Sequence, residues 1–545
     1  MMICMMHPSA GIDEARSPAE RDQPDAHTLR VITALVLSEL EQVLPATSRG
    51  LISPESSLSA AGIDESRLAD AIVRLEAHYF MRFRAEWLAD VRTCGDLIDC
   101  VARRMFDAVD RRDAVAGSAD EPPRHALRPE ASSGPQPESV PSPSSTTPLH
   151  DSFPEVVALE ERLDGLRRQG LENPFRLANE SVVGRTARIA GRDVVNFTSF
   201  DYLGLASHPD VIHAAKQAID RFGTSGSASR MVGGNTTLHD ALDEELARFL
   251  GVERAVVFPC GYGTNASVFA HLFGKGDLIL YDELSHNSIA QGATASAAAR
   301  RSFRHNDHEQ LDGLLRDLRG RYRRVVVAIE GVYSMDGDYP DLPRFLEVKR
   351  RHDAMLYVDE AHSVGTMGPN GRGICEFFGV DPAEGDLWMG TISKSLGSGG
   401  GYLAGGGRLI DYLGLTTPAF VFSTACSPPN AASALEAVRV IRREPWRVTR
   451  LRERSELFLK LANDAGLDTG PSGDTPVIPI ILGSSLRALR VSQSLLEQGI
   501  NARPILYPAV RESAARVRFF VTSEHSEEQI VATVETLAAA VAASG

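Results

Sequence analysis

Short apolar runs separated by helical stretches constrain the fold of the carboxy-terminal part of the chain more than any other feature. The clearest runs are 255–258, 278–281, 325–329 and 355–358. Runs of this kind are typical of parallel strands, because crossover helices cover both faces of such a sheet. After residue 430, helical patterns precede two further runs, at 477–481 and 517–521. We therefore expect an α/β domain with a mostly parallel sheet, followed by a smaller α+β domain.

The length of 545 residues exceeds what one ordinary core holds and suits two or three domains. Over 111–150 the composition shifts towards Pro, Ser, Thr and Gly. A segment of this composition cannot bury enough apolar surface to offset the entropy lost on ordering. We expect it to be a flexible linker between two folded units.

Charge and cysteine usage narrow the range of partners. The formal net charge of -15 argues against a nucleic-acid partner, because neutralising phosphates requires a surplus of Lys and Arg. The six cysteines are scattered without a Cys-x-x-Cys pair, so neither a disulfide framework nor a metal site is expected. This cysteine usage favours the reducing cytoplasm. The sequence also shows no signal-peptide core and no apolar run long enough to span a bilayer.

Lys394 and Asp359 are the strongest candidates for chemistry. Lys394 lies in a turn of small residues, beyond the apolar run that Asp359 closes. Pyridoxal phosphate requires a lysine amine for its aldehyde and a carboxylate for its ring nitrogen. His362 lies three residues after Asp359, where it could approach the ring hydroxyl. A helicase reading of Asp359-Glu360-Ala361-His362 fails, because no phosphate loop of the Gly-Lys-Ser/Thr type precedes it. The pattern predicts pyridoxal phosphate chemistry on an amino acid.

Two further candidates follow the neighbouring predicted strands. Gly261, Tyr262 and Gly263 form a turn before a helix, and the backbone amides of such a turn can hold a phosphate. A lone turn of this kind is more often only a site of tight packing. His286 could stack on a planar ring, although a lone histidine is more often structural.

An ordered series of motifs then carries a family resemblance. The series comprises Asn196-Phe197, Asp201-Tyr202-Leu203-Gly204-Leu205, Gly223-Thr224-Ser225-Gly226-Ser227-Ala228-Ser229-Arg230, Leu238-His239, Ser285-His286, His305-Asn306-Asp307, Glu330-Gly331-Val332-Tyr333-Ser334-Met335-Asp336-Gly337, Asp359-Glu360-Ala361-His362, Thr391-Ile392-Ser393-Lys394 and Phe422-Ser423-Thr424. From about residue 173 to the end, the chain resembles the α-oxoamine synthases, pyridoxal phosphate transferases of fold-type I. Serine palmitoyltransferase and 8-amino-7-oxononanoate synthase are members. The resemblance implies an amino-terminal segment over 151–200, a large cofactor-binding domain over 201–430 and a small domain over 431–545.

The resemblance also implies the roles of individual residues around the cofactor ring. Lys394 would hold the cofactor as a Schiff base and then act as the base at the Cα atom of the substrate. Asp359 would keep the pyridine nitrogen protonated, and His286 would stack over the ring. His362 and Ser334 would approach the ring hydroxyl.

Further residues are implied for the phosphate. They are Gly261, Tyr262, Gly263 and Thr391 of the same subunit. Ser423 and Thr424 would reach the phosphate of a neighbouring subunit, so a complete site would require a homodimer.

The carboxylate of the amino acid needs a cation, and the planar fork of an arginine suits it. Arg518 matches the arginine that the family places in a late strand. Arg516 and Arg503 are rivals, and Arg503-Pro504 resembles the Arg-Pro of serine palmitoyltransferase.

The implied reaction is the decarboxylative condensation of serine, alanine or glycine with an acyl thioester, which yields an α-aminoketone. The acyl group could be bound to coenzyme A or to a carrier protein acting in trans. An aminotransferase would share Lys394 and Asp359 but lack the motifs at 285–286 and 305–307. A cofactor-sensing regulator would need a basic DNA-recognition helix, which the acidic amino-terminal unit lacks.

The amino-terminal unit shows helical spacing of apolar residues in three segments, which predicts a small helical bundle for docking or dimerisation. Over 27–110 it also resembles an acyl carrier protein. That family attaches phosphopantetheine to a serine, but Glu65 occupies this position here and Ser66 follows it. A carboxylate cannot form the required phosphodiester. The unit is therefore either a non-carrying docking domain or a carrier that uses Ser66 after a local shift in register.

Overall fold

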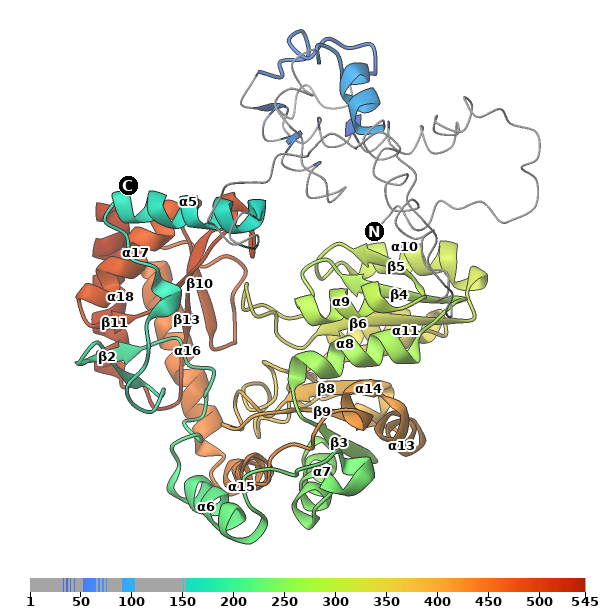
Figure 1. The fold of residues 1–545 in the computed structure, drawn as a ribbon, viewed down its shortest axis with the longest axis vertical. Coiled ribbons are helices and arrows are strands. Elements are labelled where there is room, and N and C mark those ends of the chain that lie inside the picture. Colours follow the sequence, from blue (N-terminus) through green and yellow to red (C-terminus); the bar gives the residue numbers. More distant parts are fainter. Residues whose placement is uncertain are drawn as a thin grey trace, which may run out of the picture. The chain divides into compact units, whose positions relative to one another are not determined.

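The computed structural model describes residues 153–544 continuously, together with His150 and parts of the amino-terminal unit, chiefly 52–64 and 91–102 (Figure 1). The chain divides into two units, Met1–Ser142 and Pro143–Gly545. The boundary falls within the predicted linker, whose limits stay a prediction.

In the amino-terminal unit, the described residues share one buried apolar cluster. Its members include Leu58, Ile63, Leu75, Leu97 and Val101. Residues 94–102 are helical. Much of the first two predicted helices, and both Glu65 and Ser66, lie outside the described residues, so the carrier-like domain stays a prediction.

A seven-stranded sheet organises the large domain, in the order β3-β9-β8-β7-β6-β4-β5 (Figure 1). The strands are β3 (Arg254–Phe258), β4 (Asp277–Asp282), β5 (Ala299–Phe303), β6 (Arg324–Glu330), β7 (Met355–Asp359), β8 (Leu387–Thr391) and β9 (Gly401–Gly405). Only β9 runs antiparallel to its neighbours. The predicted α/β domain of fold-type I, with a mostly parallel sheet, is confirmed.

Alternation along the strands places apolar side chains on both faces of this sheet. In β6, Val325, Val327 and Ile329 belong to one cluster, whereas Val326 and Ala328 belong to the other. Because successive side chains point to opposite faces, a fully apolar run is stable only where helices cover both.

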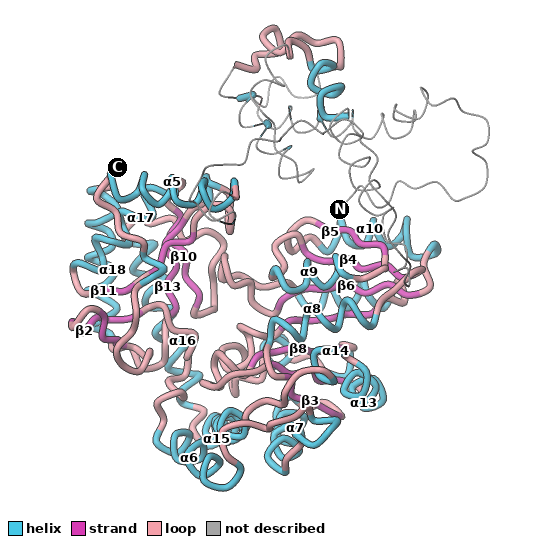
Figure 2. Tube along the Cα trace, in the orientation of Figure 1, coloured by secondary structure: helices cyan, strands magenta, loops and turns pink. Residues whose placement is uncertain are grey.

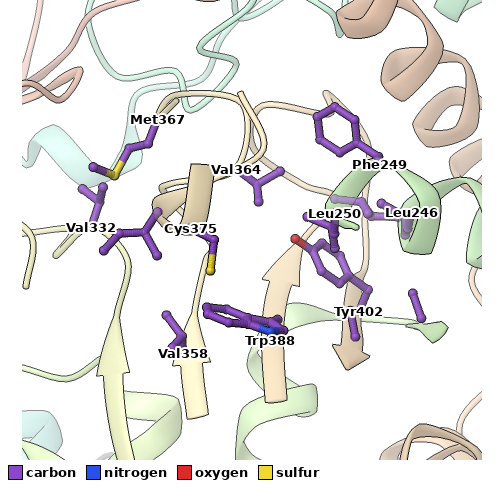
Figure 3. Packing of buried hydrophobic residues seen from close by; sticks show 14 of the residues in the cluster. Leu246, Phe249, Leu250, Val332, Val358, Val364, Met367, Cys375, Trp388 and Tyr402 are labelled. Carbon is purple, nitrogen blue, oxygen red and sulfur yellow. The ribbon is translucent and has the colours of Figure 1, made fainter. Parts of the chain in front are cut away.

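Helices cover each face. The first cluster includes residues of α7 (Thr237–Leu250), α10 (His308–Leu318), α11 (Leu342–Arg351), α12 (Ile374–Phe378) and α15 (Pro428–Arg443), which packs on α6 (Pro209–Phe222). The second includes residues of α8 (Gly261–Leu272), α9 (Asn287–Ala295), α13 (Gly407–Thr416) and α14 (Pro418–Val421). Figure 3 shows part of the first cluster, where Tyr402 of β9 lies beside Leu250 of α7.

The small domain contains the antiparallel sheet β10-β13-β12. Its elements are β10 (Val477–Ile481), β12 (Arg503–Ile505), β13 (Arg516–Phe520), α16 (Trp446–Asp464), α17 (Ser485–Glu497) and α18 (Glu527–Ala543). The amino-terminal segment, with α5 (Pro154–Arg168), β1 (Thr186–Ile189) and β2 (Arg192–Asn196), joins this domain (Figure 2). Strand β2 pairs in parallel with β11 (Ile500–Asn501), and Phe197 packs against Phe458 and Phe519.

In the part of the chain that the structure describes, none of the helices combines the length and the apolarity needed to cross a membrane.

Candidate functional site

A cavity of about 160 Å³ lies at the carboxyl ends of β6, β7 and β8. Its lining residues are Gly261, Tyr262, Asn265, His286, Ser288, Glu330, Asp359, Ala361, His362, Met389, Thr391, Ser393 and Lys394. Ligands of parallel sheets bind at this edge. A larger hollow of about 620 Å³, lined by α7 and α13, contains none of the predicted site residues. The smaller cavity is the candidate site because the predicted catalytic residues line it.

Asp359 is buried at the end of β7, where three groups hold it. Asn265 Nδ2 donates to Asp359 Oδ2 at 2.7 Å, and the amide of Ala361 donates to Oδ1 at 2.9 Å. The backbone carbonyl of Asp359 accepts from the amide of Gly331 at 2.8 Å. These contacts fix the carboxylate at the base of the cavity.

Lys394 follows β8, in the turn before β9. Burial lowers the pKa of its amine to about 8, although the negative charges of Asp359 and Glu330 oppose this shift. The positive charge of Arg518 lowers it further. The Nζ atom lies 5.9 Å from the centre of the Phe200 ring. A lysine in this state has a much larger neutral, nucleophilic fraction near neutral pH than an ordinary lysine.

His286 precedes α9 and accepts from the first turn of that helix. Its Nδ1 atom lies 2.6 Å from Ser288 Oγ and accepts from the amide of Ser288 at 3.3 Å. The backbone N–H of His286 donates to Glu330 Oε1. Burial lowers the pKa of the imidazole, so its neutral form is favoured.

His362 is buried opposite the small domain. Its Nδ1 atom is 2.7 Å from the hydroxyl of Tyr202, and its ring stacks on Phe520 with centroids 6.4 Å apart. Burial, with the charges of Lys394 and Arg518, lowers the pKa of His362 well below its ordinary value. A neutral ring therefore faces the cavity.

The motif analysis did not assign roles to Asn265, Ser288, Glu330 or Tyr202. Glu330 ends β6 directly opposite Asp359, and burial raises its pKa well above the ordinary range, as does the charge of Asp359. Its position directly after the apolar run 325–329 is a signal that could have identified it. Asn265 lies one helical turn after Gly261, so its side chain returns to the same edge of the sheet.

The start of α8 forms the opposite end of the cavity. The amides of Gly261 and Tyr262 have no hydrogen-bond partner within the described residues. Gly261 packs so closely on β8 that a Cβ atom there would lie 3.1 Å from Thr391 Oγ1. Free amides at a helix start bind anions.

Four of the residues predicted to bind the cofactor do not line the cavity. The amide of Gly263 donates to Cys260 Sγ at 3.1 Å. The carbonyl of Ser334 accepts from Arg518 at 2.5 Å. Ser423 and Thr424 follow α14 at the surface, where Thr424 is exposed. The predicted roles of these residues are untested.

The three arginines differ in their partners. Arg516 forms an ion pair with Asp336 at 2.6 Å, and Arg503 donates to the carbonyl of Pro174. Arg518 lies over the Phe520 ring at 4.5 Å, and within the described residues it has no carboxylate partner. Its buried Nε atom is also unpaired. The ion pair therefore sets Arg516 apart, and of the two arginines without a carboxylate partner in the described residues Arg518 has a buried unpaired donor.

The cavity fits pyridoxal phosphate. It presents a lysine amine, a buried carboxylate held by two donors, a neutral imidazole and free helix amides within one enclosure. These groups match the aldehyde, the ring nitrogen, the ring face and the phosphate of the cofactor.

Comparisons with known proteins agree with this geometry. The model of the family described as Aminotransferase class I and II matches residues 192–537. The 8-amino-7-oxononanoate synthase of Symbiobacterium thermophilum is 40% identical over 372 residues, which cover 68% of this chain and 94% of that protein. The solved serine palmitoyltransferase of Sphingomonas wittichii matches with a TM-score of 0.69 at 33% identity, over 73% of this chain and 99% of that one.

A structure of serine palmitoyltransferase with a pyridoxal phosphate internal aldimine also matches, with a TM-score of 0.69 at 31% identity, over 73% of this chain and all of that one. The chain belongs to the α-oxoamine synthases, pyridoxal phosphate enzymes that condense an amino acid with an acyl thioester and release carbon dioxide.

Proposed function

We propose that this enzyme condenses a small amino acid, namely serine, alanine or glycine, with an acyl thioester to give an α-aminoketone, carbon dioxide and a free thiol. The observation that carries the proposal is the uncompensated guanidinium of Arg518 near the amine of Lys394. The cation can bind the carboxylate of an amino acid, and the amine in its neutral form can accept the Cα proton.

The bound cofactor supplies an electron sink for the bonds at Cα. Lys394 accepts the Cα proton and returns a proton after carbon dioxide is lost. Arg518 binds the carboxylate and orients the bond that breaks, and this orientation decides the outcome of the reaction. Asp359 would keep the ring nitrogen of the bound cofactor protonated, and the amides at the start of α8, with Thr391, would hold its phosphate.

We also propose a homodimer with shared active sites. Ser423 and Thr424 follow Phe422, a large apolar side chain that is 85% exposed in the single chain. A subunit interface at this position would cover the ring of Phe422. The expected consequence is that each cofactor phosphate also receives Ser423 and Thr424 of the other subunit.

The acyl donor is proposed to be bound to coenzyme A or to a carrier protein in trans, in the cytoplasm. The amino-terminal unit is proposed to serve docking or assembly rather than acyl carriage. A phosphopantetheinyl mass increase mapped to Ser66 would contradict this docking role.

The test is a panel of serine, alanine and glycine against acyl-coenzyme A and acyl-carrier donors, with products identified by mass spectrometry. The proposal expects an α-aminoketone that has lost the carboxyl carbon of one of these amino acids. Transfer of the amino group to a keto acid without thiol release would indicate an aminotransferase instead.

A further inference from the structure

The side chain of Asn265 is bound on both sides, so its donors and acceptors can be assigned. One of its amide atoms lies 2.7 Å from Asp359 Oδ2, and an ionised carboxylate only accepts, so this atom is the donor Nδ2. Its Oδ1 atom accepts from the Tyr357 hydroxyl at 2.6 Å. The orientation of Asn265 therefore follows from the charge of Asp359.

Ser288 receives the second N–H of Asn265. Asn265 Nδ2 donates to Ser288 Oγ at 2.9 Å, and this oxygen lies 2.6 Å from His286 Nδ1. The backbone N–H of Ser288 also points to His286 Nδ1, at 3.3 Å. An imidazole nitrogen that accepts a hydrogen bond from an amide is unprotonated, so Nδ1 is an acceptor. The Ser288 hydroxyl must therefore donate to Nδ1.

We propose that Ser288, oriented by Asn265, is a positioning residue that fixes His286 as the tautomer with its proton on Nε2. His286 lines the cavity, and its Nε2 atom has no hydrogen-bond partner within the described residues. The Nε2–H group is therefore the donor that the ring offers to a bound molecule. Burial lowers the pKa of His286 and supports the neutral ring, against the charge of Asp359.

The same bonds connect His286 to the carboxylate that serves the cofactor nitrogen. Asp359 orients Asn265, Asn265 orients Ser288, and Ser288 sets the proton position on His286. The benefit for catalysis rests on the proposed function, because it requires a substrate that accepts from Nε2–H. The tautomer itself does not depend on the substrate.

The direct test is nitrogen NMR of the holoenzyme labelled with ¹⁵N-histidine, in which protonated and unprotonated ring nitrogens are well separated. Comparison with His286→Gln identifies the His286 signals. We expect a protonated Nε2 and an unprotonated Nδ1 in the parent enzyme. In Ser288→Ala the short hydroxyl contact is lost and only the longer backbone amide contact of 3.3 Å remains on Nδ1, so we expect a measurable Nδ1-protonated fraction. A proton on Nδ1 of the parent enzyme, or an unchanged spectrum in Ser288→Ala, would overturn the proposal.

Kinetics separate positioning from simple stability. Ser288→Ala is expected to lower kcat about tenfold with little change in KM, as the loss of one buried hydrogen bond implies. Ser288→Cys, of similar size and with a weaker donor, should recover part of the loss. The matched control is Ser296→Ala. Ser296 lies at the end of the same helix, and its buried hydroxyl donates to the carbonyl of Phe273 at 2.6 Å.

The control should lower thermal stability without changing kcat or the His286 signals. If Ser288→Ala and Ser296→Ala had equal kcat values, the role of Ser288 would be purely structural and the positioning role would be refuted. If condensation were absent from the parent enzyme while the NMR result held, the proposed function would fail and the tautomer assignment would stand.

Discussion

The large-domain and small-domain sides of the site hold their functional groups in different ways. On the large-domain side, Asp359 and His286 are held by Asn265 and Ser288, which belong to the neighbouring helices α8 and α9. On the small-domain side, Arg518 contacts a carbonyl, the Met335 sulfur and an aromatic ring. The large-domain side is therefore preorganised for a cofactor, whereas Arg518 retains capacity for an incoming carboxylate.

Replacing Lys394 by Ala should have the largest effect on the preorganised side. The variant has no amine to bind the cofactor covalently or to move the Cα proton, so condensation should fall to background. The visible absorbance of the lysine-bound cofactor should also disappear. Both properties can be measured on the purified variant, and persistence of both would refute the assignment of Lys394.

The reactivity of Lys394 should show how strongly the cavity perturbs it. In the cofactor-free protein, its pKa of about 8 means that the amine becomes half neutral near pH 8 and increasingly neutral as the pH rises further. A lysine with an ordinary pKa of about 10.4 would be neutral about two orders of magnitude less often at pH 8. Mass spectrometry of acylated Lys394 across pH 6 to about 11 measures the midpoint. A midpoint close to that of exposed lysines would contradict the preorganised cavity.

Arg518→Ala tests the small-domain side. We expect kcat/KM for the amino acid to fall about 100-fold, mainly through KM, because a charge-assisted bidentate contact is lost. Arg516→Met is the control, since Arg516 pairs with Asp336. It should lower thermal stability and leave KM for the amino acid nearly unchanged. A large rise of KM in the Arg516 variant, with no rise in Arg518→Ala, would show that Arg516 and not Arg518 binds the carboxylate.

Tyr202→Phe should have the smallest effect. It removes the hydroxyl next to His362 Nδ1 but retains the buried ring. The loss of one hydrogen bond predicts a decrease of kcat of about threefold to tenfold, and a shift in the pH titration of the visible absorbance. An unchanged titration would show that Tyr202 does not act through His362.

The sequence predicted those parts of the fold that have a strong local pattern. The apolar runs became β3, β4, β6 and β7, and the predicted residues Asp359 and Lys394 line the same cavity. The pattern missed β9, a strand with glycine at both ends, because glycine weakens a strand signal. It also missed β5, since an edge strand with Arg300 and Arg301 is not a continuous apolar run.

The supporting residues of the site were harder to predict, for a different reason. Asn265 and Asp359 are far apart in the sequence and meet only because α8 packs across the sheet edge. Arg518 and Arg516 lie two residues apart and share a face of β13, so the spacing alone could not separate them. Only their partners, Ser334 and Asp336, distinguish the two.

The most direct test of the account measures carbon dioxide and free thiol together, with a carboxyl-labelled amino acid and an acyl thioester. Decarboxylative condensation at Lys394 predicts that both products appear in equal amounts, that each requires both substrates, and that neither forms in Lys394→Ala. Thiol release that leaves the labelled carboxyl group on the product, or amino-group transfer without thiol release, would contradict it.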